Sequence, residues 1–175
     1  VNTYLQIKNN CWKESETDWS IVCDMDEFCQ ISNDELEYEN SIGTTIFKFE
    51  GYDMVNTSTD YNSTEVKINT GVKNHRYDKT LLINKKHIVD INFEVGCHGA
   101  YPTGNVRYSS KPYRLYHYRY IGKKYLIDRY REYNNRLSDD NRIRRWGIEY
   151  TQEEIQTIQF FDDLIKKSTK LFDFE

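Results

Sequence analysis

The sequence predicts a single α/β domain over residues 1–175, in which a mixed sheet is flanked by helices. Three observations support this fold class. Short segments that are apolar, or that alternate between polar and apolar residues, recur as expected for strands. Apolar residues with helical spacing occur towards both ends of the chain. A hydrophobic content of 38% and a charged content of 30% indicate a globular chain with a core.

The predicted strands differ in how much of their surface they would bury. The first follows a helix that ends within residues 1–17, and it is an apolar run that a sheet interior would accept on both faces. The others are β-branched or aromatic, or alternate in polarity, which is typical of half-buried strands. The five predicted strands are residues 19–24, 44–52, 79–83, 88–95 and 113–120.

Three later helices follow from capping and periodicity. A short helix is expected to begin at Asn33, and Gly122 precedes a helix over residues 123–137 with an apolar stripe. Thr151 and Glu154 match a capping box, which predicts a final helix that ends near residue 171. Residues 53–77 are polar and have no clear period. A loop of that length in a compact domain is usually functional or mobile, and we interpret it as a lid or an acceptor-side loop.

The composition also restricts where the protein works. No apolar run approaches the roughly 20 residues that a membrane helix needs, and no signal peptide is visible. Cys11, Cys23, Cys29 and Cys97 lack Cys-x-x-Cys spacing, so we expect reduced, structural cysteines and no zinc site. The predicted location is therefore the cytoplasm, or the host cytoplasm if the chain is viral.

Positive charge is concentrated in one part of the chain. Residues 107–145 hold 12 of the 24 Lys and Arg and carry a net charge of +8, whereas the remaining residues carry −12. This asymmetry predicts either an anionic ligand near the basic segment or a solvated basic helix. Nucleic acid is not an expected partner, because the chain is acidic overall and has no recognisable nucleic-acid module.

Three carboxylates follow the first predicted strand. Alternate residues of an extended backbone share a face, so Asp24 and Asp26 could point the same way, with Glu27 beside them. Two like charges so close repel each other unless a cation lies near them. The pattern therefore predicts a divalent-metal site at the end of a central strand. The alternative is a chance Asp-x-Asp in a solvated loop.

Several motifs extend over most of the chain, from residue 4 to about residue 150. They are Asn9–Glu14, Asp18-Trp19, Val22–Phe28, Tyr77–Thr80, Gly96–His98, Leu115–Tyr118 and residues 129–138. Together they resemble family 2-like glycosyltransferases of the GT-A fold, which occur in bacteria and in large DNA viruses. In that family a strand and helix upstream of Asp-x-Asp bind the nucleotide base, so the resemblance implies that the N-terminal nucleotide-binding portion is truncated here.

The resemblance implies a transferase that moves a sugar from a nucleotide-diphosphate donor to a hydroxyl of a glycan or other acceptor, with inversion. Mn²⁺ or Mg²⁺ would be held by Asp26, and by Asp24 directly or through water. His98 would be the third ligand and His117 the alternative. For either histidine, an ordinary core or strand-end role is the competing interpretation.

The resemblance also suggests further roles. Asp78 or Glu94 would be the base that takes the acceptor proton, Asp78 being preferred, and Glu27 would orient metal-bound water or sugar hydroxyls. Arg129 and Arg136 would bind the leaving diphosphate. Ordinary salt bridges and a solvated helix face are the alternatives for these residues. For the whole chain, the alternative is a non-catalytic remnant of the fold that binds carbohydrate or nucleotide.

Overall fold

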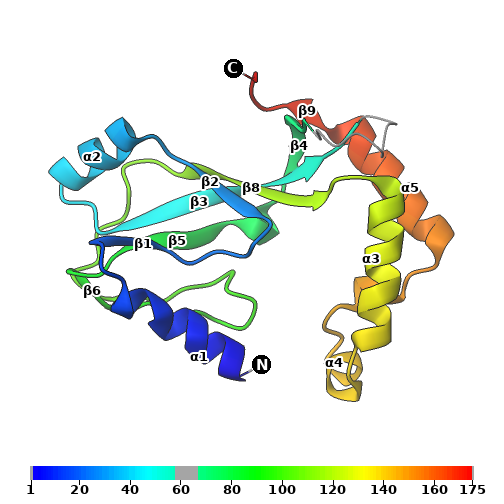
Figure 1. Ribbon diagram of the computed structural model, residues 1–175, viewed down its shortest axis with the longest axis horizontal. Coiled ribbons are helices and arrows are strands. Elements are labelled where there is room, and N and C mark those ends of the chain that lie inside the picture. Colours follow the sequence, from blue (N-terminus) through cyan, green and yellow to red (C-terminus); the bar gives the residue numbers. More distant parts are fainter. Residues whose placement is uncertain (1, 58–66, 175) are drawn as a thin grey trace. The chain divides into compact units, whose positions relative to one another are not determined.

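The computed structural model describes residues 2–57 and 67–174, which form a mixed α/β fold with a sheet flanked by helices (Figure 1). This agrees with the predicted fold class. The chain divides into two compact units. The first comprises residues 1–52 and 73–117, and the second comprises residues 53–72 and 118–175. Strands β3 (Ile46–Val55) and β8 (Tyr113–Tyr120) contribute residues to both units.

The first unit contains most of the strands. Its further elements are α1 (Asn2–Asn10), the 3₁₀ turn η1 (Cys11–Glu14), β1 (Trp19–Ile21), β2 (Glu27–Gln30), α2 (Asn33–Ser41), η2 (His75–Tyr77), β5 (Lys79–Asn84), β6 (Ile88–Asp90) and β7 (Thr103–Gly104).

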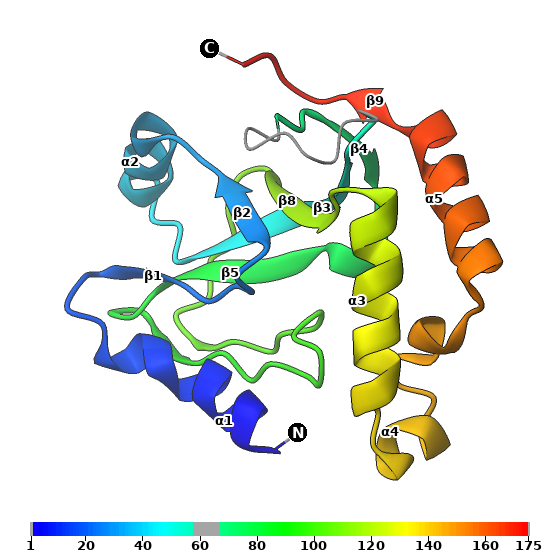
Figure 2. The same cartoon turned by 45° about the vertical axis from the view of Figure 1, so that its right-hand side comes forward.

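Antiparallel pairing organises the strands of the first unit. β1 pairs with β5, β5 with β3, and β2 with β8. Helices α1 and α2 lie on opposite sides of these strands (Figures 1 and 2). One core cluster includes Phe47, Leu81 and Leu115, each almost fully buried. A second cluster packs Trp12 of η1 and Ile91 against Ile83 of β5.

The predicted first strand, residues 19–24, is shorter and less buried than the sequence indicated. β1 ends at Ile21, whose residue surface is 50% exposed, whereas Val22 is buried. The reason is its position at the end of the strand order, beside β5, where an edge strand keeps part of its surface in water. The prediction of a strand buried on both faces is therefore wrong.

The predicted strand 88–95 is also interrupted. β6 ends at Asp90, and Asn92 has a φ of 51°, in the left-handed region that an extended strand cannot contain. Alternation in polarity did not reveal this break, because asparagine tolerates both conformations. The break separates β6 from the loop that contains the Gly96–His98 motif.

The second unit is mainly helical. Its helices α3 and α5 lie side by side (Figures 1 and 2). Their core includes Leu126, Tyr130 and Phe161, so the apolar stripe predicted for residues 123–137 is confirmed. The elements are β4 (Thr70–Lys73, whose last residue belongs to the first unit), α3 (Lys123–Arg136), α4 (Asp139–Ile143), η3 (Ile148–Thr151), α5 (Glu154–Lys167) and β9 (Thr169–Lys170).

The last helix begins and ends differently from the prediction. The capping box is formed by Glu153 and Gln156, not by Thr151 and Glu154. Ser168 ends the helix in an extended conformation, so β9 replaces the predicted last turn and pairs with β4. Thr151 instead belongs to η3, where its hydroxyl donates to the Ile148 carbonyl.

The predicted loop of residues 53–77 contains regular structure where it is described. β3 continues to Val55, and β4 and η2 occupy much of residues 70–77. Residues 58–66 of that loop lie outside the described residues. None of the described helices has both the length and the apolar character needed to cross a membrane.

Candidate functional site

The acidic segment after β1 is a turn rather than a continuing strand. The Glu27 backbone N–H donates to the Asp24 carbonyl at 3.1 Å, and Glu27 then begins β2. The backbone therefore reverses between the two aspartates, and their side chains contact different partners. The prediction that alternation would place Asp24 and Asp26 on one strand face is wrong, because the segment is not extended there.

Asp24 is held by three donors. Its Oδ1 accepts hydrogen bonds from the Tyr4 hydroxyl and the Lys8 ammonium, both at 2.6 Å, and its Oδ2 lies 3.4 Å from Lys79 Nζ. Partial burial raises the pKa of this carboxyl. The hydrogen bonds from Lys8 and Tyr4 and the charge of Lys79 lower it by more, so the pKa lies well below its usual range. Asp24 is therefore an ionised group fastened to α1.

Glu27 and Lys79 form a buried ion pair. Their side chains are 1% and 2% exposed, and Lys79 Nζ donates to Glu27 Oε1. The other oxygen, Oε2, accepts from the Asp24 backbone N–H at 3.1 Å. Lys79 thus lies between Glu27 and Asp24 and reduces the repulsion between these two carboxylates. The repulsion for which the sequence suggested a metal ion is a different one, between Asp24 and Asp26. Neither Glu27 nor Lys79 was predicted to be buried.

Asp26 faces a different group of residues. Its Oδ2 lies 3.6 Å from Nε2 of the buried His117, and its side chain is 26% exposed. The His117 ring packs on Tyr77 with the ring centres 4.3 Å apart, and His98 contacts the same tyrosine ring at 5.3 Å. The structure therefore places His98 and His117, the two predicted metal ligands, against the ring of Tyr77. Asp26 lies beside His117.

A tight loop positions His98. The Glu94 backbone N–H donates to the Gly99 carbonyl at 3.0 Å, and Cys97 N–H donates to the Glu94 carbonyl at 2.8 Å. The buried Cys97 fastens this loop to the core and leaves His98 exposed. Partial desolvation of the ring and the nearby charge of Lys79 lower the pKa of His98, which favours its neutral form. A neutral imidazole can accept a proton or bind a metal ion.

Tyr77 itself is held by contacts with the middle of β3. Gly51 N–H donates to Asp78 Oδ1 at 2.9 Å, and a Cβ at Gly51 would lie 2.5 Å from Cβ of Tyr77. Only glycine therefore allows this close approach. Asp78 also accepts from His75 at 3.0 Å, so its carboxylate is engaged in holding η2. Lys79, the next residue along the chain, contacts Glu27 and Asp24.

Glu94 lies at the base of the His98 loop. Its exposed carboxylate accepts a hydrogen bond from the Tyr101 hydroxyl at 2.7 Å. The side chain also covers Gly99, where an added Cβ would meet Glu94 Oε2 at 2.4 Å. Of the two predicted bases, Glu94 is thus the one in the same loop as a predicted metal ligand.

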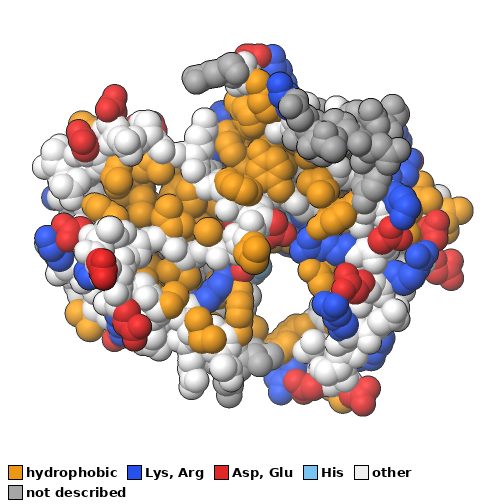
Figure 3. All heavy atoms as spheres, in the orientation of Figure 1, with side chains coloured by type: hydrophobic (Ala, Val, Ile, Leu, Met, Phe, Trp, Pro, Cys, Tyr) orange, Lys and Arg blue, Asp and Glu red, His pale blue; other side chains and the backbone are white. Residues whose placement is uncertain are grey.

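The two predicted diphosphate-binding arginines belong to α3, in the second unit, and the acidic turn belongs to the first. Arg129 donates to the Tyr125 hydroxyl and packs over the Tyr133 ring, and Arg136 pairs with Glu132. Figure 3 shows basic and acidic side chains interspersed along α3 and α5. Of the two arginines, Arg136 is therefore paired with an acid of its own helix, whereas Arg129 contacts tyrosines.

The metal prediction can be tested against these contacts. No group of three His, Cys, Asp or Glu side chains is arranged to hold a metal ion within residues 2–57 and 67–174. Asp24 does not fit as a ligand, because three donors already occupy its oxygens. Asp26 and His117 offer one oxygen and one nitrogen, a pair that Mn²⁺ accepts. These residues would form only part of a coordination shell.

Four residues of the site were missed by the sequence interpretation: Tyr4, Lys8, Lys79 and Tyr77. Lys79 and Tyr77 lie in the Tyr77–Thr80 motif, which was the one available signal for them. Tyr4 and Lys8 are an i, i+4 pair on α1, so helical spacing places them on one face. Their contact with Asp24 spans 16 residues or more along the chain, which no local pattern predicts.

No protein-family model matches the chain, nor does any curated protein or solved structure. The likeness to glycosyltransferases therefore depends on sequence motifs alone.

Proposed function

We propose that the chain is part of a glycosyltransferase that uses a nucleotide-diphosphate sugar as donor. One observation carries this proposal: the acidic turn, both motif histidines and Tyr77 converge on one cluster with buried charges. Buried charges cost free energy, and they concentrate at functional sites more than in ordinary cores. The motifs of the resemblance contribute nearly all of these residues.

In this proposal Asp26 and His117 would hold Mn²⁺ or Mg²⁺. The bound cation would offset the charge that develops on the departing diphosphate. Lys79 pairs with Glu27 and Asp24 and fixes their positions. Glu94 is the better candidate for the base that takes the acceptor proton, because it is exposed and lies in the His98 loop.

The test is release of nucleotide diphosphate from UDP- and GDP-sugars with Mn²⁺ present. We expect Asp26→Asn to lower the rate by about 100-fold or more, as for loss of a charge-stabilising group. Asp18→Asn is the matched control, because Asp18 is exposed, precedes β1 and pairs with Lys86. Absence of turnover in the unmodified chain, or equal rates for both variants, would contradict the proposal.

A second candidate is a non-catalytic module that binds nucleotide or carbohydrate. The observation in its favour is the compensation of Asp24 and Glu27 by Lys8 and Lys79, which reduces the negative charge that the turn offers to a metal ion. Binding of UDP without turnover, unaffected by Asp26→Asn, would support this module over the transferase.

A further inference from the structure

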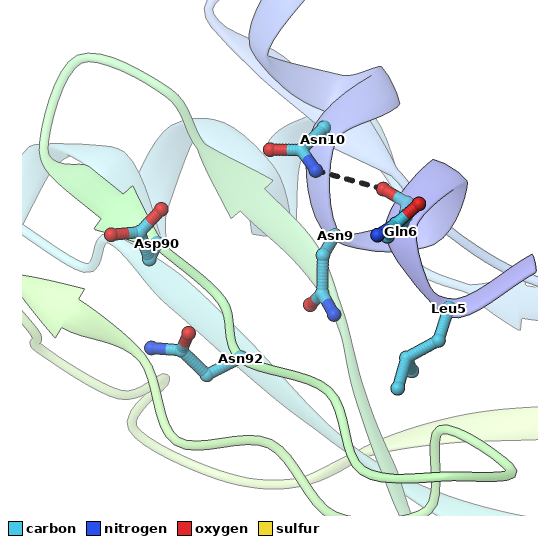
Figure 4. A pocket seen from close by; sticks show the side chains of 6 residues that line it. All are labelled: Leu5, Gln6, Asn9, Asn10, Asp90 and Asn92. Carbon is cyan, nitrogen blue, oxygen red and sulfur yellow. Dashed lines mark hydrogen bonds between the residues drawn. The ribbon is translucent and has the colours of Figure 1, made fainter. Parts of the chain in front are cut away.

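A separate pocket opens between α1 and the segment that follows β6 (Figure 4). Its volume is about 320 Å³, which is within the range of small-ligand sites. Leu5, Gln6, Asn9 and Asn10 form one wall, and Asp90 and Asn92 lie opposite them.

The two walls are fixed to each other. The Phe93 backbone N–H donates to Asn9 Oδ1 at 2.7 Å, which connects α1 to the chain after Asn92. Lys13 pairs with Asp90 at one side of the pocket. Asn92 adopts a φ of 51°, a conformation in which asparagine is favoured over most residues. The backbone conformation at Asn92 therefore keeps its side-chain amide at this wall of the pocket when no ligand is bound.

The lining is dominated by amides with unused hydrogen-bonding capacity. Each amide oxygen accepts two hydrogen bonds and each amide nitrogen donates two. Asn10 donates from its nitrogen to the Gln6 carbonyl at 2.8 Å, and Asn92 donates to the Tyr101 carbonyl at 3.0 Å. The amide oxygens of Asn10 and Asn92 therefore keep acceptor capacity, and the Asn9 nitrogen keeps donor capacity.

The charge of the pocket limits the ligand. Among the described residues, the lining contains no Lys, Arg or His, which disfavours a phosphate. Asp90 is the one carboxylate of this described lining and pairs with Lys13, so an oxygen-seeking cation would find a single, already compensated acid. Leu5 is the one apolar residue among those described there, which is too little surface for a hydrophobic ligand.

We infer that this pocket binds a neutral polyhydroxylated ligand, the chemistry of a saccharide ring. Sugar hydroxyls both donate and accept hydrogen bonds, and the amides of Gln6, Asn9, Asn10 and Asn92 match them in both respects. Leu5 would contact the C–H face of the ring. This inference does not depend on transferase activity at the acidic turn.

The test is a titration of the isotope-labelled chain, followed by NMR, with the methyl glycosides of glucose, mannose and N-acetylglucosamine. We expect saturable shifts in the side-chain amide signals of Gln6, Asn9, Asn10 and Asn92. The double variant Gln6→Leu/Asn10→Leu should weaken binding by about tenfold or more, because it removes hydrogen bonds from one wall. Asn40→Leu, at an exposed amide of α2, should bind as the unmodified chain does.

Three outcomes would overturn the inference. They are no saturable shift with any of the glycosides, the same weakening in Asn40→Leu, and larger shifts with CaCl₂ than with the glycosides. If the double variant does not fold, the single variant Asn10→Leu replaces it, since Asn10 is exposed and the substitution removes the amide oxygen that it offers to the pocket. The signals of the unmodified chain do not depend on either variant.

Discussion

Lys79 is the residue through which the acidic turn is held in this structure. Its ammonium group lies between Glu27 and Asp24, and its side chain is almost completely buried. Removing one partner of such a pair leaves an uncompensated charge in the interior, which is strongly destabilising. Lys79 therefore supplies, from the chain itself, a positive charge that offsets the carboxylates of Glu27 and Asp24. A metal ion remains part of the proposal only at Asp26 and His117.

The hydrogen bonds of Asp24 predict how stability depends on pH. Because the folded-state pKa is lowered, ionised Asp24 stabilises the fold above its unfolded pKa of about 3.9, and this contribution is lost as the pH falls towards the folded-state value. Asp24→Asn should cost about 1 kcal/mol at neutral pH, since solvent screens the partly exposed carboxylate. Urea unfolding between about pH 5 and about pH 2 should then show a shallower decline for the variant.

The control for this prediction is Asp18→Asn, which changes an exposed aspartate that pairs with Lys86. It should keep the decline of the unmodified chain. Equal slopes for Asp24→Asn and the unmodified chain would mean that Lys8 and Tyr4 do not hold Asp24 in solution.

At the residue scale, the sequence motifs identified several residues of the site but did not predict which residues they contact. Asp26 and His117 were both identified, and the structure brings them to 3.6 Å. The ion pair of Glu27 and Lys79 joins residues 52 positions apart, which no local spacing encodes. Arg129 was assigned to a ligand, but its guanidinium contacts neighbouring tyrosines on the same helix.

Among the elements, α2 depends on one buried acid. Glu39 is fully buried and accepts from the hydroxyls of Thr44, Ser110 and Tyr113, as well as from the Ser110 backbone. Burial alone would raise the pKa of Glu39, but these hydrogen bonds, mainly those of Ser110, lower it below its usual value. The carboxylate therefore connects the last turn of α2 to the residues that precede β8.

Glu39→Gln should destabilise the first unit by about 2 kcal/mol, because the amide nitrogen would face donors and leave them without an acceptor. Hydrogen exchange should show the largest loss of protection in α2. Glu37→Gln is the control at an exposed acid of the same helix and should change stability little. If the two variants behaved alike, the donors around Glu39 would contribute no net stability.

Elements with strong periodicity were predicted well from sequence. The strand 113–120 coincides with β8, and the helix 123–137 matches α3 to within one residue. Errors arose where a single backbone conformation decides the boundary. Asn92 ends the extended segment after β6, and Ser168 ends α5, yet neither residue type excludes the structure that was predicted there. β2 was missed because its acidic start suggested a turn.

At the scale of the whole molecule, the chain has two compact units and each has its own core. Leu81 is buried in the first with Phe47 and Leu115, and Leu126 is buried in the second with Phe161. The sequence suggested one domain because of its length of 175 residues. The second unit is drawn from two separated stretches of chain, residues 53–72 and 118–175. No linker marks the division, because β3, β4 and β8 cross it as strands.

Separate cores predict separate responses to a cavity. Leu126→Ala should destabilise the second unit by about 2–5 kcal/mol, and Leu81→Ala should do the same to the first. Native-state hydrogen exchange should then show faster exchange in α3 and α5 for Leu126→Ala, and in β1 and β5 for Leu81→Ala. Because β3, β4 and β8 have residues in both units, part of the increase in exchange rate should also appear in these strands. Equal acceleration throughout the described chain in both variants would instead mean that the two cores unfold as one cooperative unit.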